Sequence, residues 1–164
     1  MSNQLDPGKI AIRQLNITID HIIRKLEKDE IDLHQEFQRD DKIWTDEQQS
    51  RFIESTLIQF PLPVFYFDEN DSNKWFVIDG AQRINAWKRF ILSKELKLKG
   101  LEFFPELEGQ SWDNLSRSYQ RQIEESHILV YKMDERMDAH LRFNLYKRIN
   151  TEFTLVPLST VCCY

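Results

Sequence analysis

The residues most suited to chemistry in this chain are Asp79, Gly80, Ala81, Gln82 and Arg83, which follow directly on a short apolar run. A strand that ends on Asp-Gly and passes into a helix gathers backbone N–H groups and the positive end of a helix dipole at one point. Phosphate groups bind at such junctions. Arg83 adds a planar guanidinium that matches phosphate oxygens, and Asp79 is placed to position water or a divalent ion. The sequence therefore predicts a phosphate site here, although an Asp at a helix start also serves as an ordinary N-cap.

Two further polar groups lie far from this junction in the sequence. Gln38 and Arg39 form a second Gln-Arg pair, after a predicted strand and before Trp44. Arg148 and Asn150 lie at the end of the last predicted helix. Each pair also has a purely structural explanation. Gln38 and Arg39 could lie in a solvated surface loop, and Arg148 could interact with the exposed carbonyl groups at a helix C-terminus.

The elements that must position these residues follow from the hydrophobic periodicity. We expect strands at residues 15–19, 31–33, 63–67, 75–78 and 128–131, with a hairpin whose polar turn covers 68–74. We expect helices from Asp20, from Thr45 or Asp46 to Pro61, from Asp79, over 112–125 and over 136–149, with loops or short strands at 95–110. These elements predict an α+β domain with a small mixed β-sheet and segregated helices.

Composition describes an ordinary globular chain of 164 residues, with 41% hydrophobic and 30% charged residues. The net charge is −5, and the only net positive third is residues 51–100, with 8 basic and 6 acidic side chains. This balance favours recognition of a small anion over general binding of duplex DNA. We expect a cytoplasmic protein, since the apolar runs are short and the start lacks a signal-peptide pattern. The two cysteines, Cys162 and Cys163, are adjacent, which excludes a disulfide framework and a cysteine-based zinc site within the chain.

Several stretches, taken in order, resemble the N-terminal domain of GmrSD-type restriction proteins, which is related to the ParB/sulfiredoxin-like superfamily. They are residues 37–39, Trp44, 52–63, 77–83 and 148–151. The resemblance covers about residues 15–155 and leaves an N-terminal extension at 1–14. Residues 156–164 depart from the family pattern, and we expect a divergent tail there that fits a truncated domain.

The resemblance implies a ParB-like α+β fold with a nucleotide-binding pocket. In the family, an Asp-Gly-Gln-Gln-Arg motif is associated with hydrolysis of a nucleoside triphosphate that powers or gates a nuclease. The matching residues here are Asp79, Gly80, Gln82 and Arg83, while Ala81 replaces the usual Gln. The resemblance also implies pocket-lining roles for four more residues, which are Gln38, Arg39, Arg148 and Asn150.

We therefore expect a nucleoside triphosphate as ligand or substrate, with Mg²⁺ as its companion and with Asp79 and Arg83 as catalytic residues. The expected partners are a nuclease subunit or domain and, indirectly, DNA, with no membrane; the oligomeric state stays open. The histidines show no metal-ligand spacing, so we expect no protein metal site. One alternative is a non-catalytic ParB-like module that binds DNA or protein. A third, ranked lowest, is direct nuclease activity.

Overall fold

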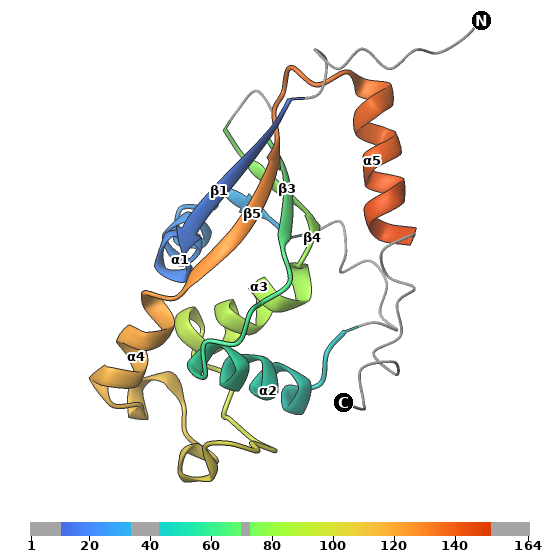
Figure 1. Cartoon of the computed structure of the whole chain (residues 1–164). Helices are drawn as coiled ribbons and strands as arrows, with labels where there is room; N and C mark the ends of the chain where they lie inside the picture. The colour runs from blue at the N-terminus through green and yellow to red at the C-terminus, as the bar shows by residue number, and fades with distance from the viewer. Residues whose placement is uncertain (1–10, 34–42, 70–72, 152–164) are drawn as a thin grey trace, which may run out of the picture.

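The computed structural model describes residues 11–33, 43–69 and 73–151. Five strands form one mixed sheet in the order β1-β5-β3-β4-β2 (Figure 1). Their bounds are Ile12–Thr18 for β1, Ile31–Asp32 for β2, Phe65–Glu69 for β3, Trp75–Asp79 for β4 and His127–Met133 for β5. The pairs β1·β5 and β3·β4 are antiparallel, whereas β3·β5 and β2·β4 are parallel. The predicted α+β class with a small mixed sheet is confirmed.

Within the residues that the structure describes, five α-helices and three shorter helical turns accompany the sheet. The helices are α1 (Ile19–Glu27), α2 (Asp46–Leu57), α3 (Ala81–Trp87), α4 (Arg117–Glu124) and α5 (Ala139–Thr151). A π-helical turn, η3 (Lys88–Leu92), continues α3, and the 3-10 turns η4 (Pro105–Leu107) and η5 (Trp112–Asn114) lie in the long connection to α4.

Helix starts follow local side-chain chemistry. Thr45 caps α2 in a full capping box, because its hydroxyl accepts from the amide of Gln48 while the Gln48 side chain accepts from the amide of Thr45. The start of α1 differs from the predicted start at Asp20: the helix begins at Ile19, and Thr18 is its N-cap, with a hydroxyl that accepts from the amide of His21. Asp20 instead lies in the first turn and pairs with Arg24.

The strands divide their side chains between two cores. On one face, Phe65, Phe67, Trp75 and Val77 belong to a large apolar core to which α1, α2, α3 and α4 all contribute buried residues. On the other face lies α5, which Figure 1 shows alone on its side of the sheet. The buried residues of this second, smaller core are Ile78, Met133, Met137 and Ile149.

The hairpin is longer than the sequence predicted. Asp68 was expected in the polar turn, but β3 extends through Glu69, and Asp68 is only 7% exposed. Its position next to Phe67 directs it toward the opposite face of the sheet, because successive strand residues alternate. A carboxylate thus lies in the interface between the sheet and α5, where Tyr146 contacts it.

Glu54 of α2 anchors part of the long connection that follows η3. This side chain is 3% exposed, and its carboxylate accepts hydrogen bonds from the amides of Glu102, Phe103 and Phe104 at 2.6–3.0 Å. A buried charge is stable only when it is paired or hydrogen-bonded. This carboxylate therefore provides the hydrogen bonds that fix the irregular segment against α2.

Candidate functional site

The predicted strand–helix junction is present where β4 meets α3. Asp79 ends the strand, and Gly80 adopts a left-handed backbone conformation with φ 107° before the helix starts at Ala81. A Cβ atom at Gly80 would lie 2.5 Å from Cδ1 of Phe65. Both the backbone angle and this close approach require glycine. The first amides of α3 have no carbonyl partner within the helix. Gly80 and Ala81 are both buried, so their amides do not meet solvent in the described structure.

Arg83 lies in the first turn of α3, next to the junction. Its side chain is 9% exposed, and its guanidinium donates to the carbonyl of Pro63, to the carbonyl of Val64 at 3.1 Å and to Oδ2 of Asp79 at 3.1 Å. The guanidinium also lies 4.2 Å from the ring centroid of Phe65. These contacts assign Arg83 first to holding the chain before β3 and the carboxylate of Asp79.

Asp79 is the accessible acid of the junction, since 45% of its side chain is exposed. The register places Tyr66 of β3 opposite it. Burial raises the pKa of the Tyr66 hydroxyl, and the charges of Tyr131 and Asp79 raise it further. Sequence reasoning missed Tyr66, and the hairpin register, with its bulge between Tyr66 and Phe67, is the signal that identifies it.

Gln82 connects the junction to the start of α2. Its side-chain oxygen accepts a hydrogen bond of 3.1 Å from the backbone amide of Trp44, the residue before the α2 cap. Gln82 is therefore a structural link in addition to any contact with a ligand. Gln38 and Arg39 lie outside the residues that the structure describes.

The last predicted pair lies on α5, and the structure brings that helix to β4. Ile149 belongs to the same buried cluster as Ile78, the residue before Asp79. Arg148 and Asn150 flank Ile149 and are exposed. The end of α5 and the end of β4 thus meet across the second core, although they are distant in the sequence. Ala81, by contrast, is fully buried, so neither its side chain nor its backbone is exposed at the surface of the described structure.

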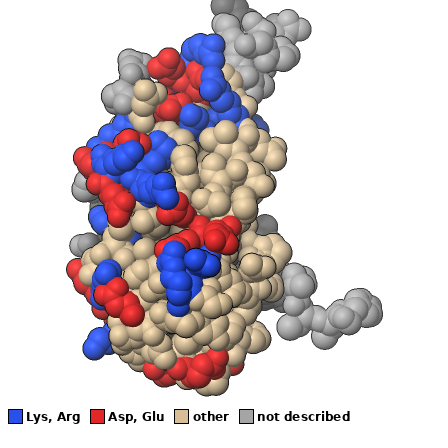
Figure 2. Space-filling model, turned by 90° about the vertical axis from the view of Figure 1, so that its left-hand side faces the viewer, with Lys and Arg blue, Asp and Glu red and all other residues tan. Residues whose placement is uncertain are grey.

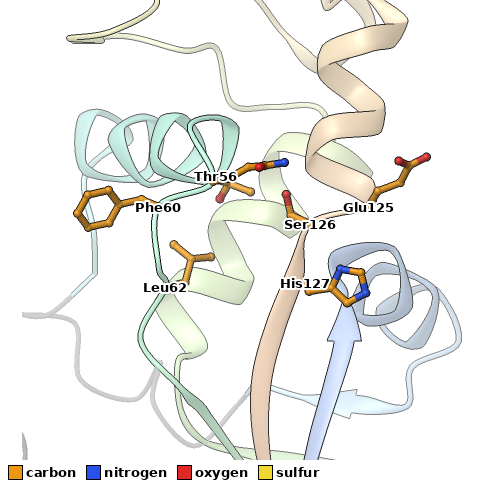
Figure 3. Close-up of a pocket in the computed structure, with 7 residues that line it drawn as sticks. Thr56, Phe60, Leu62, Glu125, Ser126 and His127 are labelled. Carbon is orange, nitrogen blue, oxygen red and sulfur yellow. The ribbon is translucent and has the colours of Figure 1, made fainter.

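One surface hollow lies elsewhere. A pocket of about 230 Å³ is formed between the end of α2 and the start of β5 (Figure 3), and its lining residues are Thr56, Gln59, Phe60, Leu62, Glu125, Ser126 and His127. Figure 3 shows Phe60 and His127 on opposite sides of the opening, with side chains that do not converge on one point. This hollow contains none of the predicted site residues, and convergent polar groups are what a specific small-molecule site requires.

Surface charge is mixed on the face viewed in Figure 2, where Lys and Arg alternate with Asp and Glu and form no continuous basic surface. Within residues 11–33, 43–69 and 73–151, no three His, Cys, Asp or Glu side chains come together as a metal-ligand group. The same residues include no helix that is both long and apolar enough to cross a membrane.

The comparisons with known proteins match the chain to a protein family. The family described as the N-terminal domain of GmrSD restriction endonuclease matches residues 19–160. No curated protein and no solved structure matches the chain. The matched residues include the β4–α3 junction and the whole of α5.

Proposed function

The chain belongs to the GmrSD restriction endonuclease N-terminal domain family, and from this premise we propose that it binds and hydrolyses a nucleoside triphosphate as the regulatory domain of a restriction system. Its place in a restriction system follows from the family. The triphosphate site is our proposal, and the observation that carries it is the β4–α3 junction. There a half-exposed carboxylate, a left-handed glycine and the first amides of a helix adjoin one another.

In this proposal Gly80 and Ala81 bind a phosphate group through their backbone amides, which requires the ligand to displace the atoms that bury them in the described structure. Arg148 and Asn150 supply contacts from α5, and Gln38 and Arg39 are the contacts expected from the preceding segment. Arg83 holds Asp79 and the chain before β3 in place, because its guanidinium already donates to both. Positioning and electrostatic stabilisation are the main requirements for phosphoryl transfer.

Asp79 fits a role beside Mg²⁺. One carboxylate oxygen pairs with Arg83, and nearly half of the side chain is accessible. Magnesium is commonly held by one or two carboxylates together with phosphate oxygens and water. When bound, the ion would neutralise charge on the phosphates, and Asp79 would orient it.

Thermal unfolding in the presence of each of the four nucleoside triphosphates, with and without Mg²⁺, tests this proposal. A ligand at about a hundred times its dissociation constant stabilises the folded state by about 2.7 kcal/mol, which raises Tm by about 5–10 °C for a domain of this size. We expect Arg148→Ala to reduce the shift and Asp79→Asn to abolish phosphate release. Arg117→Ala is the matched control, because Arg117 is an exposed residue of α4 that pairs with Glu124.

Two outcomes would contradict the proposal. If no triphosphate raises Tm of the unmodified protein, the site does not bind nucleotide. If duplex DNA is instead retained in a salt-dependent manner without any effect of triphosphate, the chain is a DNA-binding module.

A further inference from the structure

A buried polar cluster fastens α5 to the sheet. Oδ2 of Asp68 accepts a hydrogen bond of 3.1 Å from the hydroxyl of Tyr146 and lies 3.5 Å from Nη1 of Arg142. Arg142 also donates through Nη2 to the carbonyl of Asp134 at 2.9 Å. One strand carboxylate thus meets two side chains of the same helix.

The rest of the α5 interface is small. Its apolar part has four buried residues, against a much larger core on the other face of the sheet. Oδ1 of Asp68 and Nε of Arg142 are buried without a hydrogen-bond partner in the part of the chain that the structure describes. Buried polar atoms without partners reduce the stability of a packed arrangement. The attachment of α5 therefore depends strongly on the hydrogen bonds that Asp68 does make.

The same helix reaches the proposed triphosphate site. Arg148 and Asn150 come two and four residues after Tyr146, within about one helical turn. Ile149 packs in one cluster with Ile78, next to Asp79. Because a helix moves as a rigid unit over so short a distance, the position of Tyr146 on the sheet sets the position of Arg148 and Asn150.

We infer that Asp68 is a positioning residue of the triphosphate site: by holding Tyr146 and Arg142 it fastens α5 to the sheet and so places Arg148 and Asn150 at the end of β4. This inference rests on the proposed function, whose site it deepens. Asp68 itself does not contact the ligand.

Amide hydrogen exchange of residues 139–151, measured without ligand, tests the attachment. Loss of a hydrogen bond to a charged group predicts exchange faster by about tenfold in Tyr146→Phe and by up to about a hundredfold in Asp68→Ala. Phe143→Ala is the matched control, since Phe143 lies on α5 with its side chain 67% exposed. Its exchange is expected to stay within about twofold of the unmodified protein.

A double-mutant cycle on triphosphate affinity tests the positioning role. We expect Asp68→Ala to weaken binding by about tenfold, because only a fraction of molecules would keep α5 in place. In a background of Arg148→Ala with Asn150→Ala, the same substitution is expected to have no further effect. Asp68→Asn retains an acceptor for Tyr146 and is expected to retain most of the affinity. If Asp68→Ala does not fold, Tyr146→Phe takes its place in the cycle.

The outcomes separate this inference from the proposed function. An equal loss of affinity in both backgrounds, or unchanged exchange of α5, would overturn the inference while triphosphate binding by the unmodified protein stands. Absence of triphosphate binding by the unmodified protein would overturn the proposed function and the positioning role together, and the exchange measurement would still show whether Asp68 fastens α5.

Discussion

Replacement of Arg83 tests whether the guanidinium is a structural clamp of the β4–α3 junction. Three of its hydrogen bonds go to the carbonyls of Pro63 and Val64 and to the carboxylate of Asp79, and its flat face covers the ring of Phe65. The side chain is nine-tenths buried. Removal would therefore leave two carbonyl groups with lost partners in a partly closed space.

The magnitude follows from these contacts. A buried acceptor that loses its partner costs about 1–3 kcal/mol, and a cation–π contact contributes up to about 2 kcal/mol when desolvated. The pair with Asp79 adds less than about 1 kcal/mol, because 45% of that carboxylate side chain meets solvent. Such terms overlap, so we expect Arg83→Ala to lower the free energy of unfolding by about 4 kcal/mol. Arg83→Lys keeps one donor group and is expected to lower it by about 2 kcal/mol.

Urea unfolding at pH 7 without nucleotide measures these losses, and Tm is expected to fall by about 10 °C in Arg83→Ala. Arg24→Ala is the matched control, since Arg24 forms an exposed i,i+4 pair with Asp20 worth no more than about 0.5 kcal/mol. A loss below about 1 kcal/mol in both Arg83 variants, together with lost triphosphate binding, would refute the reasoning and assign the guanidinium to the phosphate.

Four other substitutions give separate predictions. Glu54→Ala is expected to lower the free energy of unfolding by about 2–4 kcal/mol, because three backbone amides lose a buried carboxylate acceptor. Urea unfolding measures this loss, and a change within experimental error would contradict the anchoring role of Glu54. Gly80→Ala is expected to lower the free energy of unfolding by about 3 kcal/mol or more, because the new Cβ would overlap an aromatic ring and the backbone would also be strained in its left-handed conformation. Gly109→Ala is the control: its Cβ would meet no atom within 4 Å, so it carries only the backbone strain of about 1 kcal/mol. Equal losses of stability in the two variants would exclude the overlap. Burial raises the pKa of Asp68 above 3.8, so the stability of the unmodified protein relative to Asp68→Asn is expected to be greatest below that pH and to decline as the pH rises through the folded-state pKa. A hydrogen-bonded arginine lowers the pKa of Asp134, so the pH dependence relative to Asp134→Asn is expected to be opposite: the stability that Asp134 contributes is lost as the pH falls below 3.8. Unfolding curves between pH 3 and 8 measure both dependences. Stability differences that changed with pH in the same direction for Asp68 and Asp134 would contradict the assignment.

The junction could be predicted from the sequence because its determinants are local. Asp79 and Gly80 directly follow an apolar strand, and the helical spacing of Ile84 and Trp87 sets in within the next few residues. The start of α2 could also be predicted from the sequence, because Thr45 and Gln48 are three residues apart and form a complete capping box. A sequence pattern that is confined to one turn of the chain specifies its local backbone geometry without long-range contacts.

Long-range side-chain pairing could not be predicted in this way. Arg83 reads as a phosphate ligand in the sequence, whereas its partners Pro63 and Val64 lie twenty residues upstream and become visible only once the hairpin is folded. Asp68 reads as a turn residue because isolated carboxylates are rarely buried. Its burial depends on Tyr146, a residue of a different element that no local pattern connects to β3.

The place of β5 in the sheet has a consequence for the order in which the protein folds. This strand is the last along the chain of the five described strands, but it lies between β1 and β3, and Met133 of β5 pairs with Ile12 of β1. Until β5 has left the ribosome, β1 lacks its partner strand β5, and β3 presents an open edge beside the apolar side chains of Phe65 and Phe67. Sheets assembled from such distant segments fold slowly, and before they are complete they expose unpaired strand edges that are prone to aggregation. Nascent chains that end before β5 are thus the form of this protein most exposed to aggregation and to proteases.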